Sequence, residues 1–261
     1  MTDSVAHQTA LHLSPHPDDE AIGCPVALLK LKDSGWAVIN VVLTQGSPGQ
    51  ESRRRAEAEE AGRRADLGLL FPDPPFSDIS RNFDKLRKLI ADLLVATDAA
   101  LVISPSPHDG HYSHEAVGRA TQLALEESPR PVTWWMWGIW ADLPLPTVLV
   151  PISAAEIEHA LIVLDAYQEE VRRNDYRRLV QGRAMANAIL GPERIFGFGS
   201  SSVEHVSLAE LITEARYCSG RWRSGPPRIL TREHILSNSG FSRDITLWVR
   251  APSVRERLLS Q

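Results

Sequence analysis

Residues 11–44 read LHLSPHPDDEAIGCPVALLKLKDSGWAVINVVLT, and this stretch decides the expected fold. Residues 11–14 form a short apolar run that ends in a Ser-Pro turn signal. Residues 37–44 are β-branched and almost continuously apolar, which is typical of a strand buried on both faces. Between them, residues 23–33 carry apolar side chains at helical spacing. Strand, helix and strand in succession predict a right-handed βαβ unit with parallel strands.

The alternation continues through most of the chain and predicts a single α/β domain over residues 1–261. Its core is expected over about residues 10–190, with a C-terminal elaboration over about residues 191–261. Further helices are expected over residues 51–66, 83–94, 114–126 and 153–189, and further strands over residues 101–104 and 132–140. The helical stretch from 153 opens with a capping box, Ser153 to Glu156, and is expected to end at Gly191-Pro192. In the less regular last part, residues 208–217 are interpreted as a helix and residues 245–249 as an edge strand.

Composition excludes several classes of protein. The chain has 261 residues, of which 43% are hydrophobic and 23% charged, as in ordinary globular proteins. Its net charge of −5 argues against a general nucleic-acid coat protein, which would be basic. The two cysteines, Cys24 and Cys218, predict neither a disulfide framework nor a thiolate zinc site. Residues 1–13 show no signal-peptide pattern, and no apolar run is long enough to span a bilayer, so we expect no membrane span. Together with the charge and the two separated cysteines, this leads us to expect a cytoplasmic protein without a nucleic-acid partner.

The first chemical signal is Pro15-His16-Pro17-Asp18-Asp19-Glu20, directly after the first expected strand. In open α/β sheets, ligands bind beyond the carboxyl ends of the strands. His16 and Asp19 are three residues apart and can converge on one divalent metal, since imidazole and carboxylate are both zinc ligands. Asp18 would then face a water molecule. The alternative is an ordinary helix N-terminus with a capping residue and acids favoured by the helix dipole.

A second cluster, residues 107–114 with the sequence PHDGHYSH, also follows an apolar strand. Three histidines, His108, His111 and His114, fall within seven residues. A polar loop would explain one histidine, but three at the same sheet edge as the first motif favour a shared site.

These two segments resemble the motifs of the zinc-dependent N-acetylglucosaminyl deacetylase family known as LmbE-like or PIG-L. The family's H/A-H-P-D-D-E is matched by residues 15–20, and its H-P-D-H by residues 111–114. A Thr-x-Gly turn at residues 44–46 and a Leu-Gly pair at residues 67–68 also fit the family pattern. The resemblance covers residues 10–125 well and the remainder loosely.

The resemblance implies a Rossmann-like, mostly parallel sheet with helices on both faces, and zinc or another divalent ion as the cofactor. It implies that His16, Asp19 and His114 are the metal ligands and that Asp18 is the base on a zinc-bound water. His111 would stabilise the oxyanion or protonate the leaving amine.

The implied reaction removes the N-acetyl group from an N-acetylglucosamine-type unit of a small glycoconjugate, for example an antibiotic intermediate. Two alternatives stay open. The first is an amidase that cleaves a larger acyl group or a thiol-conjugate amide from an amino sugar. The second is a degenerate relative that binds sugar or metal without turnover.

The second motif departs from the family pattern. Ser113 stands where the family usually has an aspartate, and a hydroxyl cannot hold an imidazolium as a carboxylate does. This departure affects the expected role of His111 more than the metal site. Asp109 or His108 are candidates to replace the missing carboxylate.

Residues expected beside the substrate are Asp109, Tyr112, which replaces the family proline, and Trp137. Alternation along residues 134–140 places Trp135 and Trp137 on one strand face and Trp134 and Trp140 on the other. Core packing is the main interpretation of these tryptophans, and an aromatic wall beside the site is the alternative.

The basic runs at residues 53–55 and 172–178 are interleaved with acids and are interpreted as solvated, salt-bridged faces. The resemblance implies that one arginine of the first run helps to hold the substrate, but several candidates compete. The Gly- and Ser-rich residues 197–202 are interpreted as a flexible loop that can serve in substrate recognition.

Overall fold

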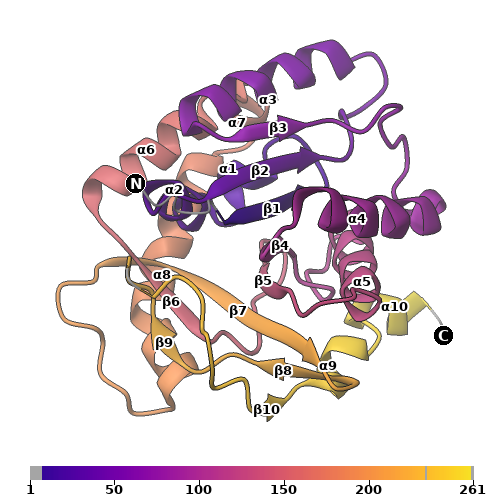
Figure 1. Cartoon of the computed structure of the whole chain (residues 1–261). Helices are drawn as coiled ribbons and strands as arrows, with labels where there is room; N and C mark the ends of the chain where they lie inside the picture. Colours follow the sequence, from indigo (N-terminus) through magenta and orange to yellow (C-terminus); the bar gives the residue numbers. More distant parts are fainter. Residues whose placement is uncertain (1–7, 233, 260–261) are drawn as a thin grey trace, which may run out of the picture.

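A mostly parallel sheet forms the centre of the molecule, as Figure 1 shows. The computed structural model describes residues 8–232 and 234–259, so most of the stretch examined for a signal peptide lies outside the described residues. The parallel strands run in the order β3-β2-β1-β4-β5, which matches five of the six strands of the Rossmann order 3-2-1-4-5-6. Their bounds are β1 (Thr9–Ser14), β2 (Ala37–Val42), β3 (Gly68–Leu70), β4 (Leu101–Pro105) and β5 (Thr133–Trp137).

Further strands, which pair mostly antiparallel, extend this sheet beyond β5, and all but β6 come from the C-terminal part of the chain; β6 and β9 pair in parallel. They are β6 (Val148–Ile152), β7 (Leu208–Cys218), β8 (Arg221–Ser224), β9 (Arg228–Ile229) and β10 (Arg243–Asp244). The strand β7 pairs with β5 through its C-terminal half and with β6 through its N-terminal half. The region expected as an elaboration therefore contributes a long strand to the same sheet, next to β5.

Helices cover both faces of the sheet (Figure 1). They are α1 (Asp19–Ile22), α2 (Pro25–Asp33), α3 (Glu51–Ala65), α4 (Phe83–Thr97), α5 (Tyr112–Glu126), α6 (Ala154–Leu164), α7 (Gln168–Arg173), α8 (Tyr176–Phe196), α9 (Thr246–Arg250) and α10 (Val254–Leu259), with a 3-10 turn η1 (Ser80–Asn82) before α4. One hydrophobic core contains side chains of α2, α3, α6 and α8, and the other contains side chains of α4 and α5. The predicted α/β class, with a mostly parallel sheet and helices on both faces, is confirmed.

Several local predictions agree with the structure. The strands β1 and β2 pair in parallel with Leu13 opposite Val41, and α2 connects them. The capping box at Ser153 is present, with Glu156 as its partner. Trp135 and Trp137 pack in the core that contains α2, while Trp134 packs in the core that contains α5.

Three predictions in the second half were wrong. Residues 208–217 form β7 and not a helix, because alternate side chains of this segment pack into the two opposite cores. The segment is rich in Leu, Ala and Glu, whose helix propensity is overridden here by pairing with neighbouring strands. Residues 245–249 lie mainly in α9, and Ile245 and Val249 are buried one turn apart.

The long helix expected from residue 153 is divided into α6, α7 and α8. The last of these continues through Gly191 and Pro192 to Phe196, beyond the predicted end. A Cβ atom at Gly191 would lie 2.9 Å from the Leu211 side chain, so glycine allows α8 to approach β7 closely. No helix among the described residues combines the length and the apolar character needed to cross a bilayer.

Candidate functional site

The two chemical motifs meet at one edge of the sheet. The strands β1 and β4 are parallel neighbours, with His12 opposite Ile103, so the loops that follow them leave the sheet side by side. The order of the strands reverses between these two, and this is the position where open α/β sheets bind ligands. His16 and Asp19 from the first loop and His111 and His114 from the second line a cavity of about 230 Å³.

Close packing brings α5 to this edge. A Cβ atom at Gly118 of α5 would lie 2.6 Å from the backbone nitrogen of Pro107, so only glycine lets the helix approach the loop after β4. This approach fixes the start of α5, which carries His114 into the site.

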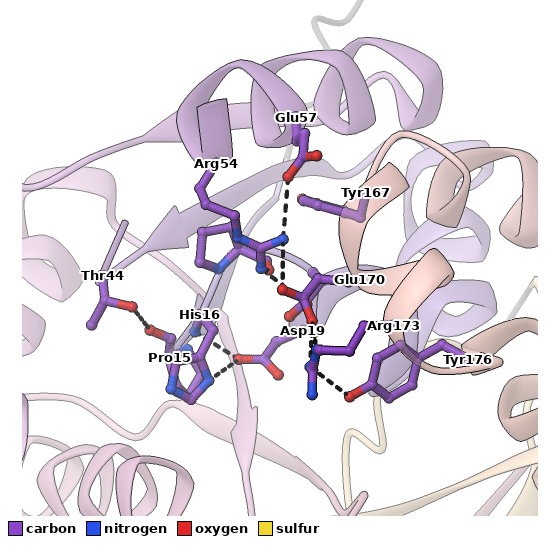
Figure 2. Close-up of polar contacts among 12 residues, drawn as sticks. Pro15, His16, Asp19, Thr44, Arg54, Glu57, Tyr167, Glu170, Arg173 and Tyr176 are labelled. Carbon is purple, nitrogen blue, oxygen red and sulfur yellow. Dashed lines mark hydrogen bonds and ion pairs between the residues drawn. The ribbon is translucent and has the colours of Figure 1, made fainter. Parts of the chain in front are cut away.

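The loop after β1 has a constrained backbone. The Thr44 hydroxyl donates a hydrogen bond to the Pro15 carbonyl at 2.8 Å, which fixes the loop to the end of β2 (Figure 2). Asp18 has a φ angle of +118°, a conformation that is strained for a residue with a side chain. Asp19 then begins α1, and its Oδ2 accepts a hydrogen bond from the His16 backbone at 2.7 Å. The strained turn aims both carboxylates at the sheet edge.

His16, Asp19 and His114 form a tight cluster. The Oδ2 atom of Asp19 lies 3.4 Å from Nδ1 of His16, and its Oδ1 lies 3.3 Å from Nε2 of His114. The ring centroids of His16 and His114 are 5.4 Å apart. His111 lies close to both, and ligand atoms of the three imidazoles fall within 4.8 Å of one another. The structure therefore brings together all the residues for which the sequence predicts metal binding or proton transfer to the leaving group.

Asp109 holds His114 on the side of the ring that faces away from Asp19. Its Oδ2 lies 2.7 Å from Nδ1 of His114, and its Oδ1 accepts hydrogen bonds from the backbone N–H groups of Ile139 and Trp140 at 2.6 and 3.2 Å. The side chain is buried and does not line the cavity, so the contact of Asp109 with substrate stays a prediction that this position does not favour. A carboxylate on the outer nitrogen of a metal-binding histidine fixes its tautomer and turns the other nitrogen toward the metal.

The structure also bears on the other two expected substrate contacts. Trp137 is fully buried, donates from Nε1 to His12 and packs edge-on against His114. It does not line the cavity, so its contact with substrate stays a prediction that this position does not favour. Tyr112 is 47% exposed and stacks on His111 instead of lining the cavity. The tryptophan that lines the cavity is Trp140, which is 56% exposed.

Neither candidate for the missing carboxylate contacts His111. Asp109 holds His114, and Nε2 of His108 lies 2.7 Å from the carbonyl oxygen of Trp248. The Nδ1 atom of His111 is buried without a hydrogen-bond partner among the described residues. Burial and the neighbouring His114 and His16 lower the pKa of His111 to about 4.

Arg54 of α3 holds the Asp18 side chain. Its guanidinium donates to Oδ2 of Asp18 at 3.0 Å and to the Pro17 carbonyl, and it is almost fully buried. Figure 2 shows the same guanidinium reaching Glu57 and Glu170, at 3.2 and 3.6 Å. The sequence analysis placed this arginine on a solvated face. Of the three consecutive arginines at residues 53–55, Arg54 is the one that is buried against the first motif and lines the cavity.

The wall opposite the histidines comes from α7 and α8. Glu170 pairs with both Arg54 and Arg173, and Arg173 donates to the Tyr176 hydroxyl at 3.3 Å (Figure 2). All four side chains line the cavity, although the sequence analysis interpreted residues 172–178 as a surface face. This wall is polar and ion-paired.

The electrostatics of the site favour a bound cation. Burial and the adjacent Asp19 raise the pKa of Asp18 well above its usual range, and Arg54 only partly offsets this. Burial alone would raise the pKa of Asp19, but His114 and His16 hold it below its usual range. Burial alone would lower the pKa of His114, yet Asp19 and Asp109 raise it to about 10. The carboxylates that stabilise a proton on His114 would equally attract a metal ion.

The residues present therefore fit a divalent metal. Imidazole nitrogen and carboxylate oxygen are zinc ligands, and these donors are buried, close together and supported by an outer carboxylate. Cys24 and Cys218 are free, and neither lines this cavity.

Fold and site together define a Rossmann-like α/β protein with a histidine and aspartate centre at the switch point of its sheet. Residues 11–125 match the PIG-L family, described as GlcNAc-PI de-N-acetylase. This match covers less than half of the chain, and it includes both chemical motifs.

Two proteins of known name are similar to this chain, one in sequence and one in fold. Diacetylchitobiose deacetylase of Thermococcus kodakarensis is 31% identical over 121 residues, which cover 41% of this chain and 45% of that protein. The aligned part thus spans less than half of the curated relative. The crystal structure of a zinc-inhibited form of the teicoplanin deacetylase Orf2 shares the fold with a TM-score of 0.60 and 16% identity, over 81% of this chain and all of that one.

The fold alone does not decide the chemistry. A 4-carboxy-2-hydroxymuconate hydratase from Pseudomonas putida has the same fold, with a TM-score of 0.57 and 17% identity, over 79% of this chain and 95% of that one. Function must therefore be argued from the residues of the site.

Proposed function

We propose that this protein is a metal-dependent hydrolase that removes the acetyl group from an N-acetylglucosamine-type unit of a glycoconjugate. The observation that carries the proposal is that Asp18, His111 and the cluster of His16, Asp19 and His114 all face one cavity. The family match of residues 11–125 and the name of the Thermococcus relative support a de-N-acetylation.

The ligands assigned to the metal are His16, Asp19 and His114. The Asp19 carboxylate lies between the two imidazoles, 3.4 Å from one and 3.3 Å from the other, and adds a negative charge that compensates a dication. Three protein ligands leave a coordination position open, as in catalytic zinc sites. When bound, the ion would polarise the amide carbonyl and acidify the attacking water.

Asp18 is assigned as the base that accepts a proton from that water. Arg54 occupies its Oδ2, which fixes the carboxylate and leaves Oδ1 as the acceptor. A fixed carboxylate within hydrogen-bond reach of the water can transfer the proton efficiently.

His111 is assigned as the group that passes a proton to the leaving amine. Its lowered pKa keeps the imidazole neutral in the free protein at neutral pH, so it takes up that proton during the reaction. An amine leaves poorly unless it is protonated as the C–N bond breaks, so the reaction needs an acid on the side of the nitrogen. The ring of His111 lies 4.8 Å from that of His114, which places it beside the ligand cluster and within the same cavity.

The test is a direct assay on the full chain loaded with zinc. N-acetylglucosaminides with different aglycones are incubated with the protein, and released acetate and free amine are quantified. Analogues with longer acyl chains test the amidase alternative on the same sugar. Acetate and amine should appear in equal amounts, and Asp18→Asn should abolish most of the activity. Absence of acetate from every N-acetylated substrate, or full activity of Asp18→Asn, would overturn the proposal.

A further inference from the structure

The buried nitrogen of the His111 imidazole is not held by a hydrogen bond. Its Nδ1 has no hydrogen-bond partner among the described residues. The nearby carboxylate of Asp109 is engaged by His114. A proton donor that pivots freely would seldom point at the leaving nitrogen, so another restraint is required.

Two aromatic rings lie nearly parallel to the imidazole. The Tyr112 ring is 4.9 Å from it, centroid to centroid, with an angle of 27° between the planes. The Trp140 ring is 5.9 Å away, with an angle of 29°. Both geometries fall within the range of stacked aromatic pairs. Tyr112 is the first residue of α5, and Trp140 follows β5, so two separate elements supply the rings.

Each ring is itself held in place. The Trp140 backbone N–H donates to Oδ1 of Asp109, and Arg183 donates to the carbonyl oxygens of Ile139 and Gly138 in the same loop, at 2.8 and 3.0 Å. On the other side, the Arg255 guanidinium of α10 lies 5.7 Å from the centre of the Tyr112 ring.

We propose that Tyr112 and Trp140 are positioning residues that fix the plane of the His111 imidazole by stacking, in place of a carboxylate on Nδ1. The bond from Cβ to the imidazole limits how the His111 ring can turn within its own plane. The flat faces of the Tyr112 and Trp140 rings limit how far it can tilt out of that plane. Its consequence for turnover rests on the proposed function, because His111 is the donor to the leaving amine in that reaction.

This arrangement depends on flat side chains and not on hydrogen bonds. An aromatic replacement should therefore preserve it, and an aliphatic one of similar size should not. Tyr112 and Trp140 are about half exposed, so their replacement by leucine leaves no large internal cavity. Phe196, which is 44% exposed at the end of α8 and does not line the cavity, provides a matched control for the loss of an aromatic ring elsewhere.

The experiment compares Tyr112→Phe, Tyr112→Leu, Trp140→Phe, Trp140→Leu and Phe196→Leu in the full chain. Acetate release gives kcat and KM, elemental analysis gives the bound zinc, and NMR gives the chemical shifts of the His111 ring protons without added metal. We expect both leucine variants to lower kcat by about 10- to 100-fold at unchanged zinc content. Tyr112→Leu should leave KM unchanged, each phenylalanine variant should keep more of the wild-type kcat than the matching leucine variant, and the control should stay close to the wild type.

The NMR measurement separates this inference from the proposed function. Stacking should displace the His111 ring-proton shifts in the wild type and in Tyr112→Phe, and Tyr112→Leu should reduce that displacement. If the wild type releases no acetate, the proposed function fails, while the shifts still test the stacking. Unchanged shifts in Tyr112→Leu overturn the inference whatever happens to kcat, and so does an unchanged kcat in an active enzyme.

Discussion

The Oδ2 atom of Asp109 lies 2.7 Å from Nδ1 of His114, and both side chains are buried. This contact orients His114 so that its Nε2 faces Asp19 at 3.3 Å. The other oxygen of Asp109 binds backbone N–H groups of the loop after β5. One carboxylate thus fixes both His114, a proposed metal ligand, and the loop that carries Trp140 in the cavity wall.

Replacement of Asp109 by asparagine should therefore weaken metal binding. We expect the zinc affinity of Asp109→Asn to fall by about 10- to 100-fold, the usual effect of losing an outer carboxylate. Competition with a chromogenic chelator measures the affinity. The control is Asp84→Asn, on an exposed position of α4. Equal affinities of wild type and Asp109→Asn would show that this contact does not support a metal ligand.

Asp18→Asn should separate catalysis from metal binding. An amide cannot accept the proton, so kcat should fall by about 10²- to 10⁴-fold. The zinc content should remain that of the wild type, because Asp18 is not in the assigned ligand set. Acetate release and elemental analysis on the same sample check both statements, with Asp33→Asn at the exposed end of α2 as the control. Loss of zinc in Asp18→Asn would instead identify Asp18 as a ligand.

Arg54→Lys tests whether the planar guanidinium is needed to hold Asp18. Lysine keeps the charge but cannot bind the Pro17 carbonyl, Asp18 and Glu57 with one rigid fork. We expect kcat to fall by about tenfold or more, since small displacements of a base are costly. Arg55→Lys on the same helix is the control. The Arg55 side chain is half exposed and forms an ion pair with Glu59 on the surface of α3. Equal activity of the two variants would contradict the assigned role.

Glu210 predicts a pH dependence of stability away from the site. This residue of β7 accepts hydrogen bonds from the backbone N–H groups of Val26 and Ala27, both at 2.8 Å. Burial raises its pKa from 4.5 to about 7 although these bonds oppose the shift. The folded state therefore holds a proton between pH 4.5 and 7 that the unfolded state releases, and stability falls as the pH rises through this window.

The comparison of wild type with Glu210→Gln isolates this effect. The free energy of unfolding of the wild type minus that of the variant should fall by about 3 kcal/mol between pH 4.5 and pH 8. Denaturant unfolding at several pH values measures it. A difference that stays constant over this range would mean that Glu210 has the same pKa in the folded and unfolded states.

The meeting of the two motifs could be predicted because parallel neighbouring strands end at the same sheet edge. That rule placed His16, Asp19 and His114 together without any knowledge of side-chain conformations. The choice of Arg54 among three consecutive arginines could not be predicted, since it depends on the rotation of α3 about its axis against the loop after β1.

Burial and long-range pairing account for the other differences from the sequence analysis. Asp109 and Trp137 lie close to the site in sequence, but whether they face the cavity or the core is decided by the loop after β5 and by β1. The segment 208–217 has local helix propensity, and only its partners β5 and β6 make it a strand. These partners lie far away in the sequence.

The proposed function depends on the coordination of one metal ion by His16, Asp19 and His114. A crystal structure of the zinc-loaded chain, with anomalous data collected at the zinc edge, tests it most directly. We expect one zinc peak that has a nitrogen or oxygen atom of each of these three residues at about 2.0–2.2 Å. His111 should lie outside the set of ligands. A zinc ion bound without Asp19 or His114, or bound elsewhere in the chain, would contradict it.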